Sequence, residues 1–286
     1  MKTHRLHASI KLLANLFGVS RSGFYEWQNR PPSRRAEEDQ RLEVSIRAAH
    51  SKTRKVYGTR RLQKALLGEG IAIGRDRLGR LRRQLGIGCL QKKKFKVTTD
   101  SNHDRPVAPN LLNQQFEANH PNQIWVADIT YIPTREGWLY LAGIKDLYTC
   151  EIVGYTMGDQ MTEGLVSQAL FQAVAKAKPQ VGLIHHSDRG SQYCAHGYRK
   201  SLATMGIRAS MSRRGNCYDN APMESFWGTL KNELVHHCRY ATRQEAIQTI
   251  TEYIEIFYNR QRLHSRLGYI SPAVFAQNYN RLRTAG

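Results

Sequence analysis

An apolar, β-branched run at residues 123–132 constrains the fold of this chain more than any other segment. It contains the letters WVADITYI, a composition typical of a central strand that is covered on both faces. Two further strands are predicted at residues 138–145 and 152–157, with Gly137 and Gly154 near their starts. The short connections between these three strands favour an antiparallel meander.

Helices and strands alternate along the next part of the chain. The pattern predicts a helix at residues 163–177, a strand at 181–186, a helix at 195–205, a strand at 207–211 and then a helix that contains Glu224. This order indicates an α/β fold with a mixed sheet flanked by helices, in which functional sites lie at strand ends. Trp125, Tyr131 and Trp138 are expected to belong to the core.

The first ninety residues have a helical pattern instead. A helix at residues 10–16 and a second helix that Ser20 can cap predict a helix-turn-helix segment within residues 1–30. A second unit is predicted at residues 36–90, with helices at 37–50, 59–67 and 75–85. The side chains expected to point inward from its last two helices are Leu62, Leu66, Leu67, Leu78, Leu81 and Leu85.

The remaining boundaries follow from changes in composition. Residues 91–121 are polar, carry a cluster of lysines at 92–96 and have no sustained period, so we interpret them as a basic linker. Residues 122–286 are then the α/β domain with a C-terminal helical extension.

Positive charge is concentrated in the helical part of the chain. The formal net charge is +20; residues 1–110 carry 25 Lys and Arg against 9 Asp and Glu, and the remainder carries 18 against 14. Such a balance suits a protein that binds DNA, although it also suits a ribosomal or membrane-surface protein. A plain helical hairpin and a solvated charged face remain alternatives for the two units. The residues expected to contact DNA here are Arg60, Arg61, Arg75, Arg77, Arg80, Arg21 and Tyr25.

Cysteines and hydropathy exclude other classes of protein. The five cysteines include no CxxC pair, which argues against a disulfide framework and a zinc ribbon. No apolar stretch approaches the length of about 20 residues that crosses a bilayer, and the N-terminus has no signal-peptide pattern. We therefore expect a cytoplasmic, nucleoid-associated bacterial protein without a membrane partner.

Asp128 and Asp188 are the first two candidate site residues. Asp128 interrupts the apolar strand, where an unpaired carboxylate costs several kcal/mol or takes up a proton. A salt bridge to an arginine or a bound cation would explain it. Asp188 directly follows a predicted strand within HHSDRGSQY, where it is either a turn cap or a second ligand. His185 and His186 precede it on opposite faces of that strand, and the inward one is interpreted as packing.

Glu224 is the third candidate, in the first turn of a helix that Asp219 or Asn220 can cap. At 100° per residue, Lys231 lies within about 20° of Glu224, and Gly228 leaves open space between them. This stripe suits a metal ligand followed by a phosphate contact, although for this helix alone a solvated surface helix is the better explanation. Contacts with phosphate are also expected from the loop that precedes the helix, at Arg213 and Arg214.

Four segments together resemble one known family: WVADITYI, HHSDRGSQY, SRRGNCYDNAPMESFWGTLKNEL and YNRQRLHSRLGYISPAVF. They are similar to the integrase-like DDE transposases of bacterial insertion sequences, whose catalytic chain comes from a second reading frame. The resemblance covers essentially the whole chain. It implies a ribonuclease H-like core in which Asp128, Asp188 and Glu224 converge on two Mg²⁺ or Mn²⁺ ions.

The resemblance also implies an activity and partners. A strand would be hydrolysed at the end of the element, and the released 3′ hydroxyl would attack another phosphodiester. Asn220 and Lys231 match positions near the site and on the DNA side of the helix. The implied partners are double-stranded DNA from the terminal inverted repeats and the target, further copies of the chain, and the product of an upstream reading frame.

Three other classes of protein remain as alternatives. A DNA-binding repressor with an inactive integrase-like domain has no use for a buried group of carboxylates. A ribonuclease H-like nuclease that cuts without joining has no need of the helical units. A structural nucleoid protein would share the charge but not the acids.

Overall fold

A five-stranded mixed sheet forms the centre of the computed structural model, which describes residues 9–90, 106–214 and 216–284. Its strand order is β3-β2-β1-β4-β5. The first three strands are antiparallel, whereas β4 runs parallel to β1 and β5 parallel to β4. This is the ribonuclease H-like arrangement, and the predicted mixed sheet is confirmed. The strands are β1 (Ile124–Thr134), β2 (Gly137–Asp146), β3 (Ile152–Gly158), β4 (Ile184–Ser187) and β5 (Arg208–Met211).

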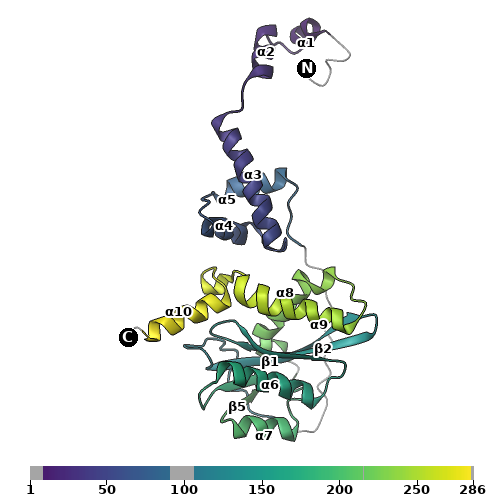
Figure 1. Cartoon of the computed structure of the whole chain (residues 1–286), viewed down its shortest axis with the longest axis vertical. Coiled ribbons are helices and arrows are strands. Elements are labelled where there is room, and N and C mark those ends of the chain that lie inside the picture. Colours follow the sequence, from purple (N-terminus) through teal and green to yellow (C-terminus); the bar gives the residue numbers. More distant parts are fainter. Residues whose placement is uncertain (1–8, 91–105, 215, 285–286) are drawn as a thin grey trace.

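Helices cover both faces of the sheet (Figure 1). Helices α6 (Glu163–Ala177) and α7 (His196–Thr204) lie on one side, and α8 (Ala221–Glu233), α9 (Arg243–Glu252) and α10 (Pro272–Thr284) lie on the other. Alternate residues of β1 divide between two apolar clusters: Trp125 and Ala127 belong to the α6 side, Ile124 and Val126 to the α8 side. The shorter elements are η2 (Cys217–Asn220), η3 (Val235–His237), the π-helical η4 (Tyr253–Gln261) and η5 (Ser265–Leu267).

Strand β4 is shorter than the sequence indicated. It begins at Ile184 rather than at Val181, because the chain still turns at Gly182, whose φ of +99° lies outside the extended region. Val181 is 85% exposed, so its apolar side chain does not mark a buried strand. The short strand leaves β1 paired with β4 only from Ile124 to Val126.

The expected aromatic core is only partly correct. Trp125 is fully buried, but Tyr131 is half-buried and Trp138 is exposed. The last two rings meet edge to face near the β1–β2 turn, with centroids 4.9 Å apart. This end of the hairpin extends beyond the residues that pair with β4, which explains why Trp138 is not covered.

The helical part begins with α1 (Ile10–Leu16) and α2 (Arg21–Asn29), which lie apart from the sheet (Figure 1). The next helices are α3 (Arg34–Lys52), α4 (Thr59–Gly68) and α5 (Arg75–Gln84). Ser20 caps α2 as predicted, because its hydroxyl accepts a hydrogen bond from the Gly23 amide at 3.0 Å. Leu62 and Leu66 are buried, but Leu67 is 53% exposed, so its predicted inward position is wrong.

Helices α3–α5 pack against the C-terminal part of the α/β domain. Tyr57 is buried, and its hydroxyl accepts a hydrogen bond from the Leu263 amide at 2.6 Å. Arg54 forms an ion pair with Glu252 of α9. The apolar cluster on the α8 face of the sheet continues into these helices, so the unit is joined to the domain by burial as well as by charge.

The described end of the expected linker is also packed. Residues 106–121 contain no helix or strand, but Leu112 is 3% exposed and the Leu111 amide donates to the Ser210 hydroxyl at 2.9 Å. This part therefore belongs to the α/β domain rather than to a loose connection. The lysine cluster at 92–96 lies outside the described residues.

Candidate active site

Asp128 lies in β1 with its side chain on the α8 face of the sheet. Its Oδ2 atom accepts a hydrogen bond from the Trp227 indole at 3.0 Å. Burial of the carboxylate, followed by the nearby charge of Asp188 and a smaller effect of Glu224, raises the pKa of Asp128 to about 8. Two other acids, two hydrogen-bond donors and the ammonium of Lys231 on α8 are its neighbours. Among the residues that the structure describes, Asp128 forms no ion pair with an arginine, so that explanation is not supported.

Asp188 follows the last residue of β4 and lies beside Asp128. Val126 and His186 are partners in the parallel β1–β4 pair, so each aspartate is two residues beyond a matched position on neighbouring strands. Asp188 Oδ1 accepts a hydrogen bond from the Gly190 amide at 2.9 Å. The register of two parallel strands thus brings both carboxylates to one edge of the sheet.

Glu224 is exposed in the first turn of α8, as the helical pattern predicted. Partial burial raises its pKa above the ordinary value. Its charge contributes to the raised pKa of Asp128, so the helix brings it toward the two aspartates. Within residues 9–90, 106–214 and 216–284, however, no three His, Cys, Asp or Glu side chains already form a group that could hold a metal ion.

Lys231 lies two turns along α8 from Glu224. Its ammonium group is 4.8 Å from the centroid of the Tyr131 ring, within the range of a cation–π contact. Burial lowers the pKa of Lys231, and the opposing influence of Asp128 shows that the two groups are near each other. The predicted stripe of α8 therefore faces the acids, while contact of Lys231 with DNA stays a prediction.

Asn220 has a different place from the one expected. It is 4% exposed, and its side-chain amide donates to the Ala127 carbonyl at 3.0 Å. It neither caps α8 with its side chain nor reaches the surface. Contact of Asn220 with DNA stays a prediction; in the structure, Asn220 ties the start of α8 to the strand that carries Asp128.

The loop before α8 is held by an ion pair. Both ends of the Arg213 guanidinium donate to the buried Asp219 carboxylate, at 2.8 and 2.9 Å, and Asn110 and Gln114 donate to the same carboxylate. The hydrogen bonds from Arg213, above all, keep the pKa of Asp219 well below its usual range. The exposed Arg213 is therefore held by an ion pair, and its contact with phosphate stays a prediction, as does that of Arg214, which is exposed in the same loop.

Some arginines of α4 and α5 are exposed, and others form ion pairs with acids of α3. Arg60 and Arg75 are exposed as predicted. Arg77 pairs with Glu38 and Asp39 of α3 at 2.8 Å, and Arg80 pairs with Asp39 at 2.6 Å. The acids missing from the arginine-rich helices are thus supplied by α3, so the expectation of an unopposed basic face is wrong for these two residues.

Four further residues, two of them on α2, remain to be placed. Arg61 is half-buried, 3.7 Å from Glu233. Arg82 of α5 is buried and donates to the Thr59 hydroxyl at 2.8 Å. On α2, Arg21 and Tyr25 are exposed early in the helix, as a recognition helix would require.

His185 and His186 are both buried, one on each face of β4. His185 shares a hydrogen bond of 3.0 Å with Tyr198, and His186 lies between the hydroxyls of Ser210 and Ser212 at 2.8 and 3.2 Å. Burial lowers the pKa of each histidine to about 4, so both are neutral packing groups. The prediction of a packing role is confirmed and extends to the second histidine.

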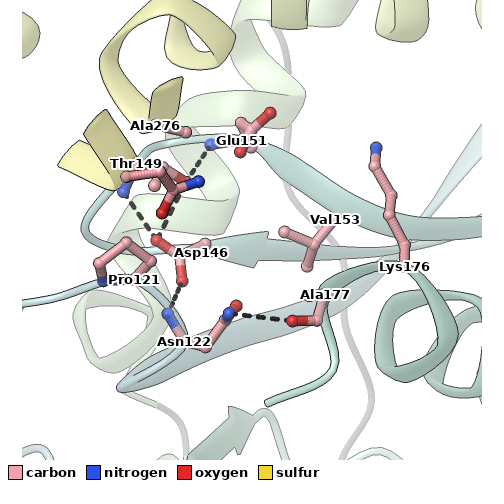
Figure 2. Close-up of a pocket in the computed structure, with 10 residues that line it drawn as sticks. Pro121, Asn122, Asp146, Thr149, Glu151, Val153, Lys176, Ala177 and Ala276 are labelled. Carbon is pink, nitrogen blue, oxygen red and sulfur yellow. Dashed lines mark hydrogen bonds between the residues drawn. The ribbon is translucent and has the colours of Figure 1, made fainter. Parts of the chain in front are cut away.

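A polar hollow of about 290 Å³ lies away from these acids, between the β2–β3 connection, the end of α6 and α10 (Figure 2). Asp146 is buried beside it and accepts hydrogen bonds from the amides of Asn122 and Thr149, at 2.6 and 2.7 Å, and from the Thr149 hydroxyl. These bonds hold the β2–β3 connection in place. Asp146 is thus a structural carboxylate, in contrast to Asp128.

The sequence interpretation missed three groups around the site: Gly143, Lys145 and the indole of Trp227. Lys145 is buried, and its ammonium donates to the Pro222 carbonyl at 3.3 Å. A charged residue in an otherwise apolar strand was the signal available for Lys145. Trp227 was assigned to an apolar stripe, and it is indeed buried, but its N–H also contacts Asp128.

Models of known protein families match most of the chain. Models of the integrase core domain match residues 118–217 and 224–280, and a model of an HTH-like domain matches residues 37–95. Among solved structures, the HTLV-2 integrase catalytic core domain in complex with magnesium (trimeric form) is similar with a TM-score of 0.44 and 15% identity, over 56% of this chain and 99% of that one.

Sequence relatives extend over nearly the whole chain. The Shigella sonnei insertion element IS600 uncharacterized 31 kDa protein is 62% identical, over 94% of this chain and 99% of its own length. The transposase for insertion sequence element IS904 of Lactococcus lactis is 43% identical, over 88% and 99%. Transposase InsF for insertion sequence IS3A of Escherichia coli is 38% identical, over 96% of each chain.

None of the helices in the described ranges is both long and apolar enough to span a membrane. The family models cover the second helical unit and the α/β domain, and the relatives align from one end of the chain to the other with few residues left over. On this similarity, the chain belongs to the transposases of bacterial insertion sequences, with an HTH-like domain and an integrase core domain.

Proposed function

We propose that this transposase cleaves DNA at the ends of its element and joins the released ends to another phosphodiester, with Asp128, Asp188 and Glu224 as its catalytic carboxylates. The observation that carries the proposal is the raised pKa of Asp128, which burial and the charges of the other two acids produce together. Asp128 is half-buried, and a structural role would favour a direct ion-pair partner for such an acid. Acids that repel one another are typical of a site that awaits positive charge.

The donor set fits a hard divalent cation. Carboxylate oxygens are the preferred ligands of Mg²⁺ and Mn²⁺, and a cation between Asp128 and Asp188 would offset the repulsion between them. Glu224 would complete the set from α8. When bound, two such ions would neutralise the charge that builds on phosphorus and would activate the attacking oxygen.

The proposed reaction needs no covalent protein intermediate. In the first step the oxygen of water attacks phosphorus, the bond from phosphorus to the 3′ oxygen breaks, and a 3′ hydroxyl and a 5′ phosphate are left. In the second step that hydroxyl attacks another phosphodiester, and one new bond forms as one breaks. No external energy source is therefore required for joining.

The rest of the chain would bring DNA to this site. The proposed division is a helix-turn-helix segment at 1–30, a basic unit at 36–90, a connection and the catalytic domain. The exposed residues proposed to contact the inverted repeats or target DNA are Arg21, Tyr25, Arg60, Arg75 and Arg214. The half-buried Lys231 is proposed to contact DNA beside the acids. Two element ends must be held together, so we also propose assembly of several copies on DNA, with or without an upstream-frame product.

Labelled element-end DNA incubated with the full chain and Mg²⁺ tests this proposal. Wild-type protein is expected to give cleaved and joined products, and Glu224→Gln to give neither while its DNA affinity is retained. Asp159→Asn, at an exposed carboxylate of the same domain, is the matched control and should keep both activities. Unchanged products from Glu224→Gln would refute the proposal; cleavage without joining by the wild type would favour a nuclease, and binding alone a repressor.

A further inference from the structure

Three side-chain hydrogen bonds fasten the start of α8 to the sheet. Asn220 donates to the Ala127 carbonyl at 3.0 Å, Lys145 donates to the Pro222 carbonyl at 3.3 Å, and the Trp227 indole donates to Asp128 at 3.0 Å. In the first two bonds the acceptor is a backbone carbonyl, so they fix the position of the helix. In the third bond the acceptor is the side chain of Asp128, a proposed catalytic carboxylate, so this bond orients the carboxylate directly.

The backbone beneath Trp227 is shaped to receive the indole. Gly143 of β2 is the cross-strand partner of Asp128. A Cβ atom at Gly143 would lie 2.8 Å from Cη2 and 3.3 Å from Cζ2 of Trp227, and 2.8 Å from the Met223 terminal methyl. The benzene part of the indole thus occupies the place of the missing side chain. A glycine opposite Asp128 is what allows the N–H of Trp227 to reach the carboxylate.

We infer that Trp227 is a positioning residue for the catalytic site: its indole N–H fixes one oxygen of Asp128, and Gly143 provides the seat that permits this. An indole nitrogen can only donate, so it always favours a carboxylate oxygen as acceptor. Fixing Oδ2 removes the rotation of the carboxylate and sets the direction of the other oxygen. Groups that orient metal ligands in this way typically change metal affinity or activity by about 10- to 100-fold. The inference rests on the proposed function.

If Trp227 had only a packing role, its aromatic ring would be required but its N–H group would not. Trp227 also contacts the Phe226 ring, with centroids 4.9 Å apart, and lies in the apolar cluster on the α8 face. Trp227→Phe keeps an aromatic ring and removes the donor, and therefore separates the two roles.

Binding of Mn²⁺ to the full chain, measured by calorimetry, is the direct readout. We expect Trp227→Phe to weaken Mn²⁺ binding about tenfold or more. Trp125→Phe is the matched control, because Trp125 is also buried in this domain and its indole donates to Asn122 at 3.2 Å, away from the acids. It should bind Mn²⁺ as the wild type does. Asp128→Asn reports whether the measured binding belongs to this site and should abolish it.

Gly143→Ala gives a second test that does not depend on the stability of Trp227→Phe. The added methyl should displace the indole, lower the melting temperature and weaken Mn²⁺ binding. Phe lacks the outer atoms of the indole that the methyl meets, and the remaining contact is with the end of the flexible Met223 side chain, which can move aside. The double variant Gly143→Ala, Trp227→Phe should therefore bind Mn²⁺ no more weakly than Trp227→Phe alone.

The outcomes distinguish a failure of the positioning role of Trp227 from a failure of the proposed metal site. If Asp128→Asn abolishes binding but Trp227→Phe binds like the wild type, the positioning role is refuted and the proposed metal site stands. Equal weakening by Trp227→Phe and Trp125→Phe would also refute it, since any lost indole would then suffice. If Asp128→Asn binds Mn²⁺ like the wild type, the proposed function itself fails at this site.

Discussion

Helices α3–α5 and the α/β domain both carry many charged side chains, but they place them differently. In the helical unit the ion pairs of Arg77 and Arg80 lie at the surface, with acids that belong to the neighbouring α3. In the α/β domain, Arg262 is buried and pairs with Glu233 at 2.7 Å, and the half-buried Asp128 lies near two other acids, hydrogen-bond donors and Lys231. Exposed charge can be exchanged for water or phosphate, whereas buried charge must be satisfied where it is.

This difference changes what a count of basic residues means. The excess of arginine in α4 and α5 predicted a broad face for DNA, but two of the arginines are engaged by α3 and Arg82 is buried. The single acid in the apolar β1 strand was the more informative charge. A charged residue is thus the stronger indication of function where its removal from water lowers the stability of the fold.

Replacing Arg262 should have the largest effect and tests this difference directly. Its guanidinium makes a two-point contact with Glu233, which also accepts from the Tyr253 hydroxyl at 2.7 Å. Arg262→Met would leave Glu233 without its main partner, and we expect the free energy of unfolding to fall by about 3–5 kcal/mol. Chemical denaturation measures it. Arg77→Met, at a surface pair, is the control; an equal loss there would show that burial does not separate the two regions.

His264 extends the comparison to pH. Burial and the nearby charges of Lys145, Arg262 and Arg61 lower its pKa to about 3. The unfolded chain takes up a proton below the ordinary pKa of about 6.5 while the folded chain does not, so stability falls as pH decreases from there toward 3. The slope contributed is at most about 1.4 kcal/mol per pH unit. Thermal unfolding of His264→Gln at several pH values should show a smaller slope than that of the wild type, and equal slopes would contradict the prediction.

DNA binding by the helical unit gives the smallest expected change. Arg60→Ala should reduce the slope of log affinity against log salt by about one, as the loss of one phosphate contact does. Arg77→Ala should change the slope less, because its guanidinium already pairs with Glu38 and Asp39. Titrations of labelled DNA at several salt concentrations measure both. Equal slopes for the two variants would mean that the pairs with α3 open when DNA binds.

Local patterns predicted most of the elements because each depends on neighbouring residues. The apolar run of β1, the serine cap of α2 and the stripes of α8 are properties of short windows. Failures occurred where a strand end depended on backbone conformation, as at Gly182, or where tertiary contact overrode a local preference. Asn220 is a good helix cap by type, but its amide bonds to Ala127, 93 residues away.

The candidate site also combines residues that the local sequence indicated with contacts that depend on the fold. The three acids were found from their local settings and from a family resemblance, but their convergence depends on which strand pairs with β1. The contact between Trp227 and Asp128 spans 99 residues, and the pair of Arg77 with Asp39 spans 38. Neither leaves a periodic trace in the sequence, so contacts of this kind were beyond reach before the fold was known.

Anomalous diffraction from crystals of the protein grown with Mn²⁺ tests the central claim most directly. The account predicts Mn²⁺ between the carboxylates of Asp128, within β1, and Asp188, directly after β4, with Glu224 turned toward it from α8. Mn²⁺ bound only elsewhere, for example in the hollow beside Asp146, with none at Asp128, would contradict the assignment of these acids as the catalytic site.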